Sequence, residues 1–143
     1  MWFLTQEGVD RYDGKYIKHY NFSDDSIKLD SRIALNWLYM DSGNILWVIG
    51  QKGRIFRYDS QHDKFKLAYI HPELIRNKPQ AFLNYGYLDK NDRIWLCYKD
   101  SITWYDIRTG TTLHMPTPVN GEITAIEQTD SNHFFIGTGN GLF

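Results

Sequence analysis

The chain has 143 residues, of which 42% are hydrophobic and 16% are aromatic, and its formal net charge at pH 7 is −1. This length suffices for one domain with a substantial core, and the hydrophobic content argues against disorder. Because the charges are balanced and interspersed, the chain offers no basic field to nucleic acid or to an anionic membrane, so we expect neither as a partner.

Metal, disulfide and membrane chemistry also find little support in the sequence. The single cysteine, Cys97, excludes an internal disulfide and a multi-cysteine metal site, and the five histidines lack metal-ligand spacing. No stretch approaches the roughly 18 apolar residues of a membrane span, and the first residues do not form a signal peptide. We therefore expect no cofactor, no metal and no direct membrane contact, and any export signal lies outside this sequence.

The first predicted unit covers residues 2–20. Three short strands are expected there, and Asp13-Gly14 is a strong hairpin signal between the last two. The expected strands are Trp2–Leu4, Gly8–Tyr12 and Tyr16–Tyr20. The polar residues 21–32 are expected to form a loop that leads to the next unit.

The second predicted unit covers residues 33–70 and has four strands. Its expected strands are Ile33–Met40, Ile45–Gly50, Arg54–Asp59 and Phe65–Ile70. The first of them is apolar on both faces, so we expect it to be buried on both. A connection follows at residues 71–80, compatible with one helical turn around Glu73–Arg76.

Two further units follow, over residues 81–115 and 122–143. The expected strands are Ala81–Leu88, Arg93–Tyr98, Ser101–Tyr105, Thr111–Met115, Glu122–Gln128 and His133–Thr138, with another beginning near Gly141. Pro116 and Pro118 are expected to end strand pairing between the units, because proline cannot donate to a ladder.

The units repeat one pattern. When Trp2, Trp47, Trp95 and Phe135 are taken as equivalent, the spacings are 45, 48 and 40 residues. Such spacings match the roughly 40–50 residues of a four-stranded propeller blade, whereas the long helical segments of other solenoids are missing. The predicted fold is therefore all-β, a β-propeller fragment of four-stranded antiparallel blades, roughly three and a quarter blades in extent.

Most conspicuous residues of the repeat have a structural interpretation. The tryptophans are expected in the core, since burying them stabilises the fold by a few kcal/mol. Gly8, Gly53 and Gly141 are expected to supply positive φ in hairpins. The acidic turns that begin at Asp41 and Asp89 lack the alternating ligands of a calcium loop, so they are predicted to be Asx turns.

Recurring motifs suggest a relationship to a known family. They are Asp41-x-Gly43-x-x-Leu46-Trp47, Arg11-Tyr12-Asp13, Arg57-Tyr58-Asp59 and Gly137-Thr138-Gly139-Asn140-Gly141-Leu142. Together they resemble the two-component regulator propeller repeat. That resemblance implies the periplasmic sensing region of a bacterial hybrid histidine kinase, which responds to carbohydrate breakdown products and controls genes for polysaccharide use. No phosphoacceptor or ATP-binding segment is visible, so this chain is expected to be non-catalytic.

Two other classes stay open as alternatives. Sugar-cleaving propellers carry a turn of the form Ser-x-Asp-x-Gly-x-Thr-Trp, and here Asp41 and Gly43 keep its spacing while Trp47 lies one residue too far on. Paired carboxylates for glycoside chemistry cannot be identified from the spacing. A glycoside hydrolase or lyase propeller, and a propeller that binds only proteins, are therefore the competing readings.

Binding residues are expected in the loops that differ between repeats, where cationic side chains could donate to an oligosaccharide or its carboxylate. The candidates are Arg32, Lys52, Arg76, Lys99 and His114. An open arc of blades would also expose strand edges and terminal faces, so we expect the chain to self-associate as a homo-oligomer.

Overall fold

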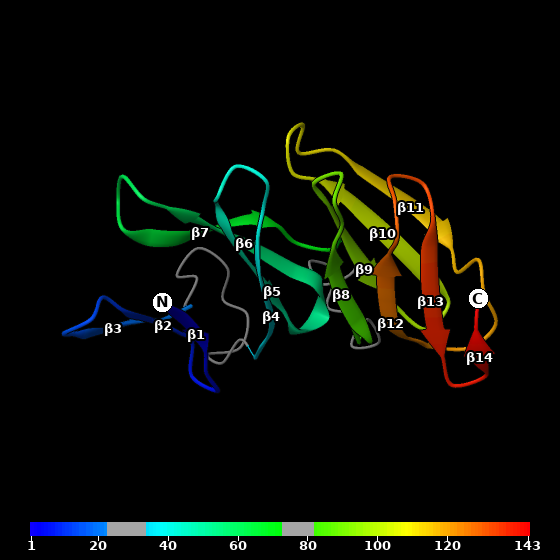
Figure 1. Ribbon diagram of the computed structural model, residues 1–143, viewed down its shortest axis with the longest axis horizontal. Coiled ribbons are helices and arrows are strands. Elements are labelled where there is room, and N and C mark those ends of the chain that lie inside the picture. Colours follow the sequence, from blue (N-terminus) through cyan, green and yellow to red (C-terminus); the bar gives the residue numbers. More distant parts are fainter. Residues whose placement is uncertain (23–33, 73–81) are drawn as a thin grey trace. The chain divides into compact units, whose positions relative to one another are not determined.

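The chain folds into four antiparallel β-sheets that follow one another in sequence, and the computed structural model describes residues 1–22, 34–72 and 82–143 (Figure 1). The all-β prediction is confirmed at this level. The chain divides into two compact units, residues 1–71 and 72–143, which are described in turn. No helix in the described part of the chain is long and apolar enough to span a membrane.

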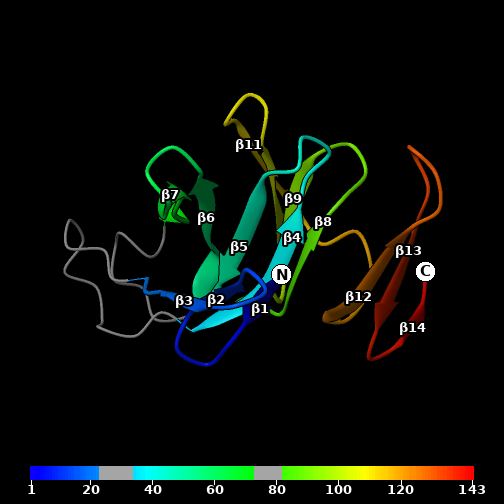
Figure 2. The same cartoon turned by 60° about the vertical axis from the view of Figure 1, so that its left-hand side comes forward.

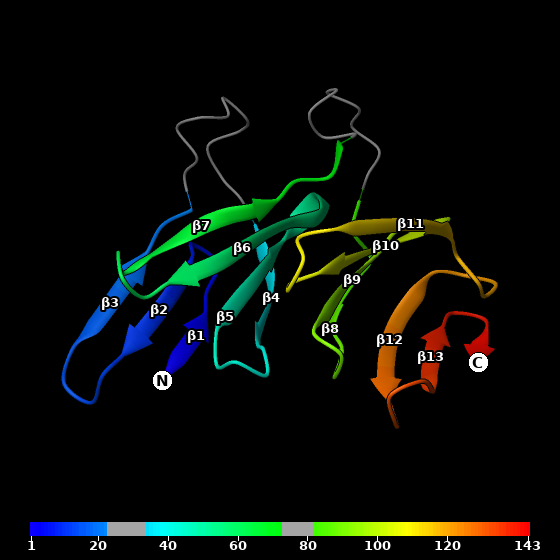
Figure 3. The same cartoon turned by 90° about the horizontal axis from the view of Figure 1, so that it is seen from above.

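The first unit contains one sheet of three strands and one of four. The three-stranded sheet has the order β1 (Trp2–Leu4), β2 (Val9–Tyr12), β3 (Ile17–Tyr20). The four-stranded sheet has the order β4 (Leu35–Met40), β5 (Leu46–Gly50), β6 (Arg54–Asp59), β7 (Lys64–Tyr69), with the short 3-10 turn η1 (Gln51–Gly53) between β5 and β6. Strands β3 and β7 are thus edge strands of their sheets (Figure 3).

An apolar cluster joins these two sheets. Val9 of the first sheet packs with Val48 and Phe56 of the second, and all three are buried. Partly buried side chains surround them, among them Trp2 and Phe22. Strands rich in β-branched and aromatic residues suit such an interface, because their side chains pack well on a pleated surface.

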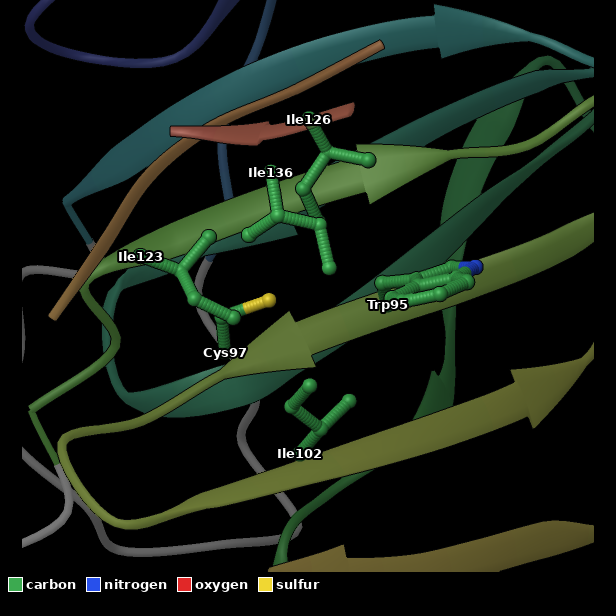
Figure 4. Close-up of a cluster of buried hydrophobic side chains, with 6 residues drawn as sticks. All are labelled: Trp95, Cys97, Ile102, Ile123, Ile126 and Ile136. Carbon is green, nitrogen blue, oxygen red and sulfur yellow. The ribbon is translucent and has the colours of Figure 1, made fainter. Parts of the chain in front are cut away.

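The second unit contains one sheet of four strands and one of three. The first has the order β11 (Thr112–Pro116), β10 (Ser101–Asp106), β9 (Arg93–Cys97), β8 (Tyr85–Leu88), and the second has the order β12 (Ile123–Gln128), β13 (Phe134–Thr138), β14 (Gly141–Leu142). Figure 2 shows both sheets from another side. Their common core consists of Trp95, Cys97, Ile102, Ile123, Ile126 and Ile136 (Figure 4).

The predicted equivalence of the tryptophans is confirmed by strand register. In the next strand, the residue opposite each of Trp2, Trp47 and Trp95 is the one that directly precedes a Tyr-Asp pair. These residues are Arg11, Arg57 and Trp104. Trp47 and Trp95 are only 2% and 4% exposed, so their assignment to the core is also confirmed.

The acidic turns are Asx turns, as predicted. In each, one carboxylate oxygen accepts hydrogen bonds from the amides two and four residues later, at 2.8–2.9 Å. The other oxygen accepts a hydrogen bond from an indole, at 2.7 Å between Asp41 and Trp47 and at 2.8 Å between Asp89 and Trp95. The fixed interval of six residues between the aspartate and the tryptophan is therefore a structural requirement of the turn.

Three expectations differ from the structure. Strand β4 is not buried on both faces, since its residues are partly buried or exposed, whereas every residue of β5 is buried. Pro116 is itself the last residue of β11, opposite Ser101, so pairing ends after this proline and not before it; an edge strand tolerates the missing amide donor. Strand β8 begins at Tyr85, four residues later than predicted.

Glycine conformations agree with prediction at two of three positions. Gly53 and Gly141 have φ values of 79° and 144°, as expected of hairpin glycines. Gly8 does not have positive φ, and its reason is different: a Cβ atom there would lie 2.3 Å from the backbone oxygen of Tyr20. Close approach of two backbones, and not turn geometry, requires glycine at this position.

Candidate functional site

An open groove of about 700 Å³ lies between the two sheets of the first unit, where edge strands β3 and β7 flank it. We call it the β3/β7 groove. Its charged lining residues are Lys18, Asp63, Lys64 and Lys66, and its aromatic lining residues are Tyr20, Phe22, Phe56 and Phe65. His19, Asn21 and Leu67 complete the lining. A concave surface with both apolar and polar side chains is the usual form of a small-molecule site.

Aromatic rings form the apolar part of the groove. Phe22 packs against Phe56 and Phe65 with ring centroids 5.0 and 4.8 Å apart. Phe65 in turn contacts Tyr20 edge to face at 5.6 Å. Tilted and edge-to-face pairs of this kind are the preferred aromatic geometries, so the rings hold one another in place.

Asp63 is the polar centre of the groove. Its carboxylate accepts hydrogen bonds from the hydroxyls of Tyr20 and Tyr58, at 2.6 and 2.5 Å, and forms ion pairs with Arg11, at 3.2 Å, and with Lys18. Arg11, Lys18 and Tyr20 belong to the first sheet, whereas Tyr58 belongs to the second. Asp63 therefore links the two sheets across the groove.

The backbone at Asp63 has an unusual conformation. Its φ is 49°, in the left-handed region, and the corresponding hairpin position of the third sheet is occupied by Gly110 with a φ of 71°. Aspartate tolerates this region better than most residues but still less well than glycine. The chain thus places a carboxylate where a glycine would be less strained, because the carboxylate binds four partners.

These contacts shift the pKa values of the groups involved. The hydrogen bond from Lys18, followed by those from Tyr20 and Tyr58, holds the pKa of Asp63 well below its usual range. Burial, together with the hydrogen bond to Asp63, raises the pKa of both tyrosines. At neutral pH the centre of the groove therefore consists of an ionised carboxylate and two neutral phenols.

A second carboxylate stands behind the groove at the end of β6. Asp59 forms an ion pair with Lys66 and accepts a hydrogen bond from His62 Nδ1 at 2.7 Å. The bond from Lys66, then that from His62, lowers the pKa of Asp59. Asp59 also accepts the amide of Gln61, so it is chiefly a cap for the β6–β7 turn.

The described lining of the groove does not present the pair of carboxyl groups that glycoside hydrolysis uses. Glycoside cleavage uses two carboxyl groups on opposite sides of the scissile bond. Of the described residues that line the groove, only Asp63 has a carboxylate, and this carboxylate already accepts hydrogen bonds from Tyr20 and Tyr58 and forms an ion pair with Arg11. Within residues 1–22, 34–72 and 82–143, no three His, Cys, Asp or Glu side chains group so that they could hold a metal ion.

The loop residues suggested by the sequence lie elsewhere. Lys52 is in η1 with a φ of 69°, Lys99 is exposed in the β9–β10 turn, and His114 on β11 is within 2.8 Å of the Thr103 hydroxyl through Nδ1. Arg32 and Arg76, and the helical turn suggested near Arg76, lie outside the described residues. Their roles in binding remain predictions.

Sequence inspection missed the groove because its residues come from two hairpins. Lys18, Tyr20 and Phe22 lie in one alternating run and Lys64, Phe65 and Lys66 in another, about 45 residues away. One signal was available: Asp63 stands where the next repeat has Gly110. A charged residue in place of a turn glycine marks a position with a requirement beyond chain reversal.

Comparison with solved structures identifies proteins of similar fold. The extracellular domain described as that of the hybrid two-component system BT3049 from B. thetaiotaomicron superposes with a TM-score of 0.69 and 22% sequence identity, over 99% of this chain and 21% of that chain. Two structures of the extracellular domain of BT4673 from B. thetaiotaomicron, described once as a one-component and once as a hybrid two-component system, give TM-scores of 0.69 and 0.68. Their identities are 18% and 17%, over 99% of this chain and 19% and 18% of theirs.

The likeness is one of fold. This chain spans about a fifth of the length of the solved chains that it matches. The sequence repeats resemble those of two-component sensor regions. The solved extracellular domains of such systems share the fold of this chain. Comparison with protein-family models gives no match, and comparison with curated proteins gives none either.

Proposed function

We propose that this chain is a ligand-recognition segment of an extracytoplasmic sensor, built from propeller blades, which binds a carbohydrate fragment in the β3/β7 groove. The observation that carries the proposal is the groove itself, in which aromatic rings and charged donors line one concave surface. The fold shared with extracellular domains of two-component systems supports the sensor role.

Propeller architecture is the first part of the proposal. The four sheets would be successive blades, with limits near residues 2–20, 33–70, 81–115 and 122–143. The recurrence of one tryptophan register and one Asx turn supports this division. In a ring, each blade packs face to face on the next, which removes most exposed sheet surface.

Carbohydrate recognition is the second part. Sugars present C–H groups on one ring face and hydroxyls around the rim, so a site needs an apolar platform beside polar donors. Phe22 and Phe65 would supply the platform, and Lys18 and Lys64 would supply donors. Asp63 would keep the two sheets at the separation that the ligand requires.

Signalling is the third part and depends on the parent protein. In this proposal the segment is periplasmic, catalysis is absent from it, and ligand binding is passed on to control transcription of genes for polysaccharide use. The descriptions of the matched solved domains as parts of two-component or one-component systems support this direction. The chemistry of signal output would reside in other parts of the sensor.

Calorimetric titration with a panel of oligosaccharides tests the proposal. We expect saturable binding of at least one compound and no change in its chain length after prolonged incubation. Phe22→Ala should weaken that binding about tenfold, because it removes an apolar wall of the groove. Phe82→Ala, at an exposed phenylalanine of the second unit, should leave the affinity unchanged.

The same experiment separates the alternative functions. Shortened products would indicate a glycoside hydrolase or lyase and would contradict the sensor proposal. Absence of binding to every oligosaccharide would favour a propeller that recognises proteins. Equal affinities of the Phe22→Ala variant and the unaltered chain would place the ligand outside the β3/β7 groove.

A further inference from the structure

The β3/β7 groove has an excess of positive charge. Among the described lining residues, the side chains of Lys18, Lys64 and Lys66 stand against the carboxylate of Asp63, an excess of two positive charges among the lysines and the aspartate. The whole chain, in contrast, has a net charge of −1. Cationic side chains are therefore concentrated at this surface, and such a concentration attracts anions.

The three lysines differ in their engagement. Lys66 forms an ion pair with Asp59, and Lys18 forms one with Asp63. Lys64 is exposed and forms no ion pair with any residue in the described part of the chain. Among the described lysines of the groove, Lys64 is therefore the one whose ammonium group has no ion-pair partner and can bind a ligand.

Lys18 can also turn toward a ligand without leaving the Asp63 carboxylate unpaired. Asp63 would keep the hydrogen bonds from Tyr20 and Tyr58 and the ion pair with Arg11. The Lys18 side chain is about half exposed, at 49%, and its movement is opposed by the ion pair with Asp63 and by a cation–π contact of Nζ with the Tyr20 ring, at 5.0 Å from the centroid. Both lysines line the groove, so an anionic group bound there could contact them.

We propose that the ligand of this groove is an acidic oligosaccharide, with a carboxylate or sulfate bound by Lys64 and Lys18 and a sugar ring packed on Phe22. The inference rests on the proposed carbohydrate function and adds the charge of the ligand to it. The aromatic wall favours a sugar ring over a free inorganic anion, and the lysines favour an acidic sugar over a neutral one.

Calorimetry with charge-matched probes tests this inference. The probes are a galacturonic acid trimer, its methyl ester, a sulfated chondroitin tetrasaccharide and its desulfated form. We expect at least one free acid or sulfated compound to bind about tenfold or more tightly than its neutralised or desulfated form. The pair that shows this difference identifies whether a carboxylate or a sulfate is recognised.

Two variants test the residues. Lys64→Gln should weaken binding of the acidic probe about two- to fivefold, and the double variant Lys18→Gln/Lys64→Gln about tenfold, since exposed ion pairs contribute modestly. Arg108→Gln removes the same charge from an exposed site in the second unit and should have no effect. Raising the salt concentration from about 50 to about 500 mM should reduce the difference in affinity between the charged and neutral probes, because salt screens exposed charges.

The outcomes separate this inference from the proposed function. If neutral and acidic probes bind equally, or if Lys64→Gln and the double variant bind like the unaltered chain, the groove does not select acidic sugars although it still binds carbohydrate. If no probe and no neutral oligosaccharide binds, both the inference and the carbohydrate function are overturned. Thermal melting of each variant verifies that the fold is intact.

Discussion

Asp63 shows how one side chain can serve both the fold and the site. It adopts a left-handed backbone conformation and receives bonds from both sheets of the first unit. Burial of the Tyr20 and Tyr58 rings gives the site its apolar side, and their hydroxyls need an acceptor. The same carboxylate therefore accepts hydrogen bonds from both tyrosine hydroxyls and brings a negative charge into the groove.

Stability should depend on the ionisation of Asp63. Its pKa is lowered in the folded state, chiefly by Lys18, so its contribution is present above the ordinary aspartate pKa near 4 and is lost as pH falls toward the folded value. Asp63→Asn keeps a residue that tolerates positive φ but removes the charge. We expect urea unfolding to show that, between about pH 5 and about pH 2.5, the free energy of unfolding falls less in this variant than in the unaltered chain.

The control for this experiment is Asp100→Asn, which removes one negative charge from an exposed turn. It should lose stability with acid as steeply as the unaltered chain. If Asp63→Asn were also indistinguishable from the unaltered chain, Asp63 would not be the acid-sensitive link between the two sheets.

At the scale of elements, the turns that precede β5 and β9 have the same construction, in which an aspartate carboxylate accepts a hydrogen bond from the indole of a tryptophan six residues later. Asp89 is the more buried example, with its side chain fully enclosed, and it also forms an ion pair with Arg93 at 2.8 Å. The carboxylate thus holds the turn, the following strand and the core indole together. Register of the strand follows from the turn.

Removing the buried carboxylate should be costly. Asp89→Ala leaves an indole N–H, two amides and Arg93 without their acceptor, so we expect a loss of about 2–4 kcal/mol in the free energy of unfolding. Asp130→Ala changes an Asx turn that is exposed and has no indole partner, and it should lose much less. Equal losses in chemical denaturation would show that the indole bond is unimportant.

Strand positions followed largely from the sequence, because hairpin signals and alternation are local properties. The repeated Asp-to-Trp interval and the turn at Asp13-Gly14 anchored most strands to within two residues. Burial was less predictable: β4 has an apolar sequence yet its residues are only partly buried or exposed, and Gly8 is required by the backbone of Tyr20, twelve residues away in sequence. The burial of a strand's faces and the close approach of two backbones are decided only when the strands and sheets assemble.

The groove could not be derived for a related physical reason. Its two sides belong to different sheets, and their separation depends on how Val9 packs against Val48 and Phe56. Sequence pattern identified repeats, and repeats favour the loops that vary between them as binding sites. The structure instead offers a concave surface between edge strands, which residues 18–22 of one hairpin and 63–67 of the other line.

At the scale of the whole molecule, two sheets have exposed apolar faces. On the first sheet Phe3, Tyr12 and Ile17 share one face by register, and on the last sheet Phe135 and Leu142 do. Phe135 occupies the tryptophan position of its repeat, yet it is 53% exposed. Such faces usually pack against a further surface.

We therefore predict that the isolated chain self-associates through these faces. Light scattering coupled to size exclusion should give a mass above 16.9 kDa that rises with concentration. Phe3→Ser/Ile17→Thr and Phe135→Thr/Leu142→Ser should each shift the distribution toward the monomer. Phe82→Ser, at a comparably exposed site outside the strands, should not, and a monomer at high concentration for the unaltered chain would contradict the prediction.

The proposed function places carbohydrate binding in the β3/β7 groove, and amide chemical-shift mapping by NMR tests that proposal most directly. The titrant is the oligosaccharide that binds most tightly in calorimetry. The proposed function predicts saturable shifts concentrated at residues 18–22 and 63–67, with the first unit affected more than the second. Shifts centred on Lys52, Lys99 or His114, or no shifts at saturating ligand, would contradict it.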